Sequence, residues 1–139
     1  MHSNTPLPAL VLHSSPALHR HPWAWPGVAA AAAIVLAAAA STAPAHALGL
    51  LLAAPLLEEI VFRAGLQEAL LRRCDSTLLA NVLTAFMFAA AHVAVRADVQ
   101  AGWTLWPALA IGLLYQRRRR LAPCIALHTL FNAVWLLGA

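Results

Sequence analysis

Apolar residues along this chain gather into five long runs, separated by short polar stretches. The runs cover approximately residues 25–43, 47–71, 77–95, 100–116 and 121–137. A helix needs roughly 20 predominantly apolar residues to cross a bilayer. The pattern therefore predicts an all-α, polytopic transmembrane helix bundle of about five spans, in which the run 100–116 is marginal in length.

The ends of two runs carry recognisable helix signals. Pro44 marks the end of the first run, because proline lacks the backbone N–H that a helix interior needs. Ser76 precedes the third run, and its hydroxyl is a good N-cap. Trp23 and Trp25 stand before the first run, where tryptophan side chains anchor spans at the membrane surface. We expect a transmembrane domain over residues 23–139.

The beginning of the chain differs from the rest. Residues 1–22 hold four His and four Pro with little periodicity, and proline at this density discourages a helix. The histidines lack the spacing of a zinc site. We therefore expect a flexible tail here rather than a metal site.

Composition supports the membrane assignment. Hydrophobic residues make up 62 % of the chain and charged residues only 10 %, whereas soluble domains average about 25 % charged. The net charge of +4 comes from Arg alone, in short clusters between apolar runs. Since no basic face with interleaved aromatic residues accompanies these clusters, nucleic-acid binding is not expected. Two cysteines are too few for a disulfide framework.

The distribution of arginine predicts an orientation. With a cytoplasmic N-terminus, seven of the nine arginines fall on the cytoplasmic side: Arg20, Arg72, Arg73 and Arg117 to Arg120. Arg96 lies on the other side, and Arg63 lies within a span. We therefore predict that the N-terminus is cytoplasmic and the C-terminus is outside.

A few polar residues interrupt the second, third and fifth runs. A charged group at bilayer depth costs roughly 2.5 to 3.5 kcal/mol on insertion scales, so such residues usually have partners or a function. The alternative is that the charges mark a helix end at the membrane surface. The set consists of Glu58, Glu59, Arg63, Asn81, His92, His128 and Asn132.

Residue spacing predicts which of these side chains meet. Positions four apart share one helix face, so Glu59 reaches Arg63, and Glu68 pairs with Arg72 near the polar end of the same helix. Phe88 similarly lies beside His92, and His128 beside Asn132. Glu58 points about 100° away from Glu59. We interpret Asn81 as structural and Phe88 as a packing residue.

Helix depth favours a meeting of Glu58 and His92. Glu58 lies 15 residues from Arg73, and His92 lies 16 residues from Ser76, which places them at matching depth on consecutive helices. His128 is only 8 residues from Arg120. The fifth helix must therefore be tilted or shifted deeper to join them.

These residues could together hydrolyse a peptide bond. A carboxylate and an imidazole can hold a water and remove its proton, while Arg63 keeps Glu59 charged. His128 beside the Asn132 amide offers donors to the oxygen that becomes negative in acyl transfer. The alternative for each polar residue alone is an interhelical hydrogen bond.

The motifs resemble those of the CAAX-protease and bacteriocin-processing (CPBP, Abi) family of intramembrane proteases, whose eukaryotic relatives trim prenylated CAAX tails. The family pattern EExxxR, FxxxH and HxxxN appears here as Glu58–Arg63, Phe88–His92 and His128–Asn132, and the resemblance covers about residues 47–137. It implies that Glu58 is the general base and that His92 holds the water. It also implies supporting roles for Glu59 and Arg63, and an oxyanion site at His128 and Asn132.

The resemblance implies a membrane-embedded protein substrate that is membrane-anchored or lipid-modified and is cut near its C-terminus. This chain is shorter than most members, and resembles the processing enzymes of bacterial C-terminal sorting systems, which implies a bacterial cytoplasmic membrane. We expect no cofactor, because no HExxH motif is present. If zinc is bound instead, its ligands would be Glu58, Glu59, His92 and His128.

Two other functions are weighed against hydrolysis. A non-catalytic membrane immunity or interaction protein would keep the polar cluster as a packing network. A proton-coupled carrier is less favoured, because no inverted repeat or matching pair of broken helices is visible.

Overall fold

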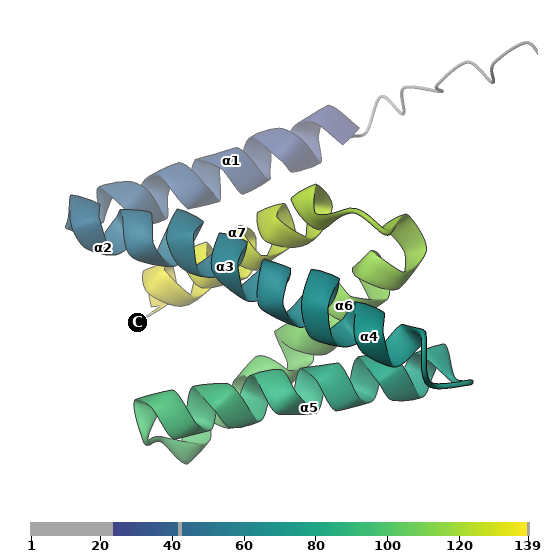
Figure 1. Ribbon diagram of the computed structural model, residues 1–139. Coiled ribbons are helices and arrows are strands. Elements are labelled where there is room, and N and C mark those ends of the chain that lie inside the picture. The colour runs from purple at the N-terminus through teal and green to yellow at the C-terminus, as the bar shows by residue number, and fades with distance from the viewer. Residues whose placement is uncertain (1–23, 42, 139) are drawn as a thin grey trace, which may run out of the picture.

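A computed structural model describes residues 24–41 and 43–138 (Figure 1). The expected tail, residues 1–22, and the interfacial Trp23 lie outside the described residues. Helices joined by short turns make up the described part, which has no strand, and this confirms the predicted all-α class.

Five helical segments follow one another in the described residues. The first is α1 (Ala24–Ala40), and the second is one long helix over Pro44–Leu71, followed by α5 (Thr77–Arg96). A 3-10 helix (Val99–Thr104) leads into α6 (Leu105–Arg118), and α7 (Leu121–Gly138) is last. The long helix is made of α2 (Pro44–Leu48), a π-helical segment (Gly49–Ala53), α3 (Ala54–Glu59), a second π-helical segment (Ile60–Gln67) and α4 (Glu68–Leu71).

Three of these segments are long and apolar enough to cross a membrane: Pro44–Leu71, Thr77–Arg96 and Leu121–Gly138. The protein is therefore an integral membrane protein. α1 and α6 have 17 and 14 residues, which is short for a spanning helix. The count of five spans and the cytoplasmic N-terminus remain predictions.

The helices pack around α7. α1, α3 and α6 each contact α7, and α5 packs against α6 and the 3-10 helix. One core cluster joins α1, the long helix and α7 through Ala38, Ala47, Leu51 and Ala133. Small residues at such contacts let helix backbones approach closely in lipid, where packing rather than the hydrophobic effect drives association.

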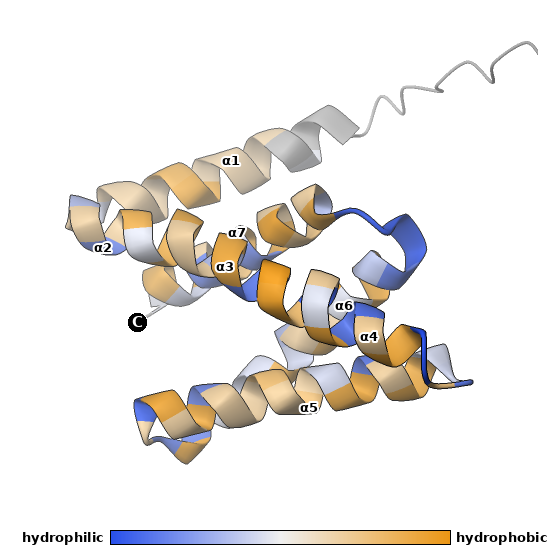
Figure 2. Cartoon of the chain, viewed as in Figure 1, coloured by the Kyte–Doolittle hydropathy of each residue, from blue (hydrophilic) through white to orange (hydrophobic). Residues whose placement is uncertain are grey.

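Polar and apolar side chains are distributed as a lipid solvent requires. Figure 2 shows that apolar residues dominate the long helices, and many of the large ones are exposed, such as Val95 at 87 %. The interior holds buried polar side chains, namely Glu59, Arg63, Gln67, Asn81, Thr84 and His128. The polar residues of the second, third and fifth runs therefore face the bundle, where partners can offset their burial.

One end of the bundle collects the arginine-containing turns, and we call it the Arg-rich end; it comprises Arg72, Arg73 and Arg117 to Arg120. Arg119 Nη1 lies 2.6 Å from Glu68 Oε2, and the Tyr115 hydroxyl donates to the same oxygen at 3.2 Å. The predicted Glu68–Arg72 pair is confirmed at 3.4 Å. The predicted N-cap at Ser76 is confirmed too, since its Oγ accepts from Leu79 N–H at 3.2 Å.

The long helix is interrupted at Pro55, which the apolar pattern did not predict. The Ala54 N–H bonds to the Gly49 carbonyl in π-helical fashion, and Pro55 has no N–H to offer. The Leu50 carbonyl is thereby left without its usual helical donor, and Asn132 Nδ2 of α7 donates to it at 2.8 Å. A side chain of α7 thus supplies a hydrogen bond that the proline removes.

Gly112 allows α5 and α6 to approach closely. A Cβ at this position would overlap Asn81 Oδ1, while Asn81 is buried and donates to the Leu109 carbonyl at 3.2 Å. Gly112→Ala is therefore expected to destabilise the protein by about 1 to 3 kcal/mol, the usual cost of overpacking. The thermal unfolding midpoint in detergent measures this effect.

Two variants control the Gly112 experiment. Gly65→Ala places a Cβ 3.6 Å from the Ile60 carbonyl oxygen, which is an ordinary van der Waals contact. Stability should therefore be kept. The double variant Asn81→Ala/Gly112→Ala should recover stability relative to Gly112→Ala, because the obstructing amide is gone. Equal midpoints for Gly112→Ala and Gly65→Ala would show that the close approach is unimportant.

Candidate active site

A buried charge network extends along the inner face of the long helix. Arg63 Nε donates to Glu59 Oε2 at 2.9 Å, as the spacing predicted, and Arg63 Nη1 donates to Gln67 Oε1 at 3.2 Å. Gln67 Nε2 continues to the Gly112 carbonyl of α6 at 3.0 Å. The three side chains of the long helix are fully buried. The Glu59 carboxyl group is therefore held in a fixed position beside a buried cation.

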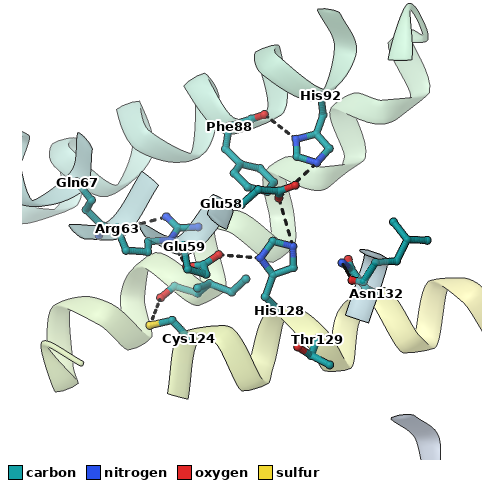
Figure 3. Close-up of polar contacts among 12 residues, drawn as sticks. Glu58, Glu59, Arg63, Gln67, Phe88, His92, Cys124, His128, Thr129 and Asn132 are labelled. Atoms are coloured by element: carbon teal, nitrogen blue, oxygen red, sulfur yellow. Dashed lines mark hydrogen bonds and ion pairs between the residues drawn. The ribbon is translucent and has the colours of Figure 1, made fainter. Parts of the chain in front are cut away.

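His128 of α7 joins the two carboxylates (Figure 3). Its Nδ1 lies 2.8 Å from Glu59 Oε1, and its Nε2 lies 3.5 Å from Glu58 Oε2. The residue count required the last helix to be tilted or shifted deeper. At the Arg-rich end, Arg119 bonds to Glu68, which lies before the end of α4. Glu68 follows Glu59 by nine residues and Arg119 precedes His128 by nine residues, so the Arg119–Glu68 pair agrees with His128 lying level with Glu59.

His92 approaches Glu58 from α5. Its Nε2 lies 3.8 Å from Glu58 Oε2, so the two residues meet at the depth that the residue count predicted. The Phe88 ring stacks on the His92 ring with centroids 4.3 Å apart, and its edge faces His128 at 5.8 Å. Phe88, expected as a packing residue, thus fixes both imidazoles.

Glu58 is the least constrained member of the group. Its side chain is 28 % exposed, whereas Glu59 is fully buried. Glu58 Oε2 has no hydrogen-bond partner within the described residues, and the two nearest nitrogens, at 3.5 and 3.8 Å, are beyond ordinary hydrogen-bond length. Separations of this kind suit a bridging water.

Hydrogen-bond partners indicate which ring nitrogens carry protons. His92 Nδ1 lies 3.0 Å from the Phe88 carbonyl oxygen, and His128 Nδ1 faces the ionised Glu59. Both partners only accept hydrogen bonds, so each Nδ1 donates and each Nε2 is the ring nitrogen that faces Glu58. Such a group has room for a shared proton or a donor molecule between Glu58 and the two imidazoles.

Asn132 lies beside this group rather than in it. One N–H of its amide donates to the Leu50 carbonyl, and an amide nitrogen has two such donors. Thr129 Oγ1, one turn earlier on α7, donates to the Leu51 carbonyl at 2.9 Å. These bonds hold α7 against the long helix, and no acceptor for the second N–H of Asn132 is found within the described residues.

A pocket of about 510 Å³ lies over Glu58. Its polar lining includes Glu58, His92, His128 and Asn132 from three helices. The remaining lining residues are mostly apolar or stand near the turn after α5: Leu50, Ala54, Phe88, Arg96, Asp98, Gln100, Ala101, Trp103, Thr104, Pro107, Ala108, Ile111, Phe131 and Trp135. The arrangement is that of a ligand site with a few convergent polar groups.

The four potential zinc ligands do not form a recognisable metal site. Within residues 24–41 and 43–138, no group of three His, Cys, Asp or Glu side chains has the geometry to hold a metal ion. Both oxygens of Glu59 already have a partner, Arg63 for one and His128 Nδ1 for the other. Whether zinc binds to the remaining three side chains stays a question for experiment.

Three contributors to the site were not identified from the sequence. Gln67 extends the charge network, Gly112 accepts its hydrogen bond, and Thr129 links α7 to the long helix. Gln67 follows Arg63 by four residues, so the repeated spacing was a usable signal. Asn81 is buried between α5 and α6, which agrees with the structural role expected for it.

Comparison with known families assigns the chain. A family model described as type II CAAX prenyl endopeptidase Rce1-like matches residues 40–134, which is more than half of the chain. The chain belongs to this family. Rce1-like membership indicates a CAAX-protease-like intramembrane peptidase in general, acting on a membrane-associated protein, and it agrees with the resemblance carried by the three motifs. No curated protein and no solved structure matches the chain.

Proposed function

We propose that this Rce1-like protein is an intramembrane endopeptidase that hydrolyses a peptide bond near the C-terminus of a membrane-anchored or lipid-modified protein. The observation that carries the proposal is the convergence of Glu58 Oε2 with His92 Nε2 and His128 Nε2 at a pocket. By the resemblance to bacterial sorting enzymes, the protein works in a bacterial cytoplasmic membrane.

Hydrolysis proceeds here by an activated water. Glu58 takes a proton from a water that His92 orients, and the hydroxide oxygen attacks the carbonyl carbon of the substrate. Asn132 donates its second N–H to the oxygen that becomes negative, and His128 donates as well when the proton shared among Glu58 and the two imidazoles resides on its Nε2. The tetrahedral intermediate collapses, the C–N bond breaks, and the leaving nitrogen receives the proton held by Glu58.

Glu59 and Arg63 act by positioning. Glu59 holds His128 by the bond to Nδ1, and Arg63 balances the charge of Glu59. Neither side chain lines the pocket, so each acts through His128 rather than on the substrate.

Peptide cleavage by the purified full chain tests this proposal. Proteoliposomes are incubated with a mixture of membrane-associated peptides, and mass spectrometry identifies the products, with the Glu58→Gln protein as the blank. New peptide ends that appear only with the unsubstituted protein support the proposal. Identical products from the two proteins would contradict it.

The proposed reaction uses no metal ion. Addition of phenanthroline or another strong zinc chelator is therefore expected to leave the cleavage rate in the same proteoliposomes unchanged. The rate is compared before and after the chelator, and again after zinc is added back. Loss of cleavage that zinc restores would show that the donor set binds a metal after all.

A further inference from the structure

The pocket occupies only one half of the bundle. It is lined by the later turns of α5 and α7, the earlier turns of the long helix, the 3-10 helix and the first turns of α6. No residue of the Arg-rich end lines it. On α5, His92 is four residues before Arg96, about 6 Å from the helix end at 1.5 Å per residue. The site is therefore near the turn that follows α5, at the opposite end of α5 from the Arg-rich end.

The other side of the site is closed. Arg63 and Gln67, which follow Glu59 toward the Arg-rich end, are fully buried and hydrogen-bonded. An apolar cluster extends from the pocket-lining Ile111 to Tyr115 and Cys124, with Leu71, Leu114 and Leu121 packed against it. A water or peptide from the Arg-rich end would have to pass through this packed layer.

The residues around the pocket opening fit a membrane surface. Arg96, Asp98 and Gln100 line the pocket near the turn after α5. Arg96 lies over the Trp135 ring at 5.3 Å, and Trp103 is 72 % exposed. Tryptophan is enriched where a membrane meets water. The opening is therefore at the interface, where both water and an extended peptide segment are available.

The distribution of arginine then indicates on which side of the membrane the pocket opens. Six arginines gather at the Arg-rich end, and Arg96 stands alone at the pocket end within the described residues. Short connections rich in arginine stay in the cytoplasm. We infer that the pocket opens to the side of the membrane away from the cytoplasm, and that the substrate is a membrane-anchored protein whose cleaved segment lies on that side. This inference rests on the proposed function for its substrate, and it excludes a lipid-modified tail that stays in the cytoplasm.

Cysteine labelling in sealed cells tests the inference. Cys74 lies in the turn between α4 and α5, and serves as the native reporter for the Arg-rich end. In a Cys74→Ser background, Gln100→Cys reports on the pocket opening and Ala54→Cys on the pocket itself. Cys124 is buried, and the Cys74→Ser protein alone measures its background. The probe is a membrane-impermeant maleimide, added to intact cells and to permeabilised cells.

We expect Gln100→Cys and Ala54→Cys to be labelled in intact cells as fully as after permeabilisation. Cys74 should be labelled only after permeabilisation. Labelling of Cys74 alone in intact cells would overturn the orientation. Labelling of Gln100→Cys but not of Ala54→Cys before permeabilisation would overturn the direction of opening.

A cleavage measurement separates this inference from the proposed function. Right-side-out and inverted vesicles receive the same peptides from outside, and the right-side-out vesicles should cleave them without detergent. Cleavage by sealed inverted vesicles alone would overturn the inference and leave the hydrolase proposal intact. Absence of cleavage in both, even with detergent, would count against the hydrolase, while the maleimide result still decides which way the pocket opens.

Discussion

Substitution of Gln for Glu58 is expected to abolish detectable peptide cleavage while the protein stays folded. The amide keeps the size of the side chain but cannot take a proton from water. General-base catalysis by a positioned side chain contributes about 10² to 10⁴-fold, so a loss of this order is expected. Glu58 is partly exposed and makes no hydrogen bond within the described residues, and folding should therefore not depend on its charge.

The measurement pairs the cleavage rate with the thermal unfolding midpoint in detergent. Glu68→Gln is the matched control, because it makes the same chemical change at the Arg-rich end, away from the pocket. It should leave cleavage unchanged. Unchanged cleavage with Glu58→Gln would rule out Glu58 as the base and would favour the non-catalytic membrane protein, in which the polar cluster serves only packing.

Arg63→Met should give the largest loss of stability. The substitution removes the cation that balances Glu59 and takes a hydrogen-bond partner from Gln67, and all of these groups are fully buried. Removal of one member of a buried ion pair typically costs about 3 to 5 kcal/mol, because the other charge is left uncompensated. The unfolding midpoint, followed by tryptophan fluorescence, reports this loss.

Two further variants show whether the loss comes from the stranded charge. Arg72→Met removes an arginine whose side chain is 75 % exposed, and little change is expected, since exposed ion pairs contribute little. Glu59→Gln/Arg63→Met removes both buried charges, and should be more stable than Arg63→Met alone. If the double variant is less stable than the single one, the uncompensated Glu59 is not the cause.

Local spacing predicted the contacts made within one helix. The Glu59–Arg63 pair, the Phe88–His92 stack and the Ser76 cap each depend on residues three or four apart, and all three are present. Such contacts follow from helix geometry alone.

Contacts between helices were predicted less completely, because they depend on relative helix depth and on breaks in the backbone pattern. The approach of Glu58 and His92 could be counted from the tight turn that joins their helices. The bond from His128 to Glu59 depends on where α7 begins along the long helix. The Arg119–Glu68 pair marks that level, and the sequence does not give it. The bond from Asn132 to Leu50 required the π-helical segment before Pro55, which an apolar run does not signal.

The bond between Asn132 and the Leu50 carbonyl links two properties of the pocket. Leu50 and Asn132 both line the pocket that holds Glu58. In the proposed reaction, a substrate carbonyl that accepts the second N–H of Asn132 also shifts the amide that is bonded to the backbone near Pro55. The width of the pocket and the hydrogen bond to the reacting carbonyl then depend on the same amide. A substitution at Pro55 that widens the pocket should therefore also slow the reaction.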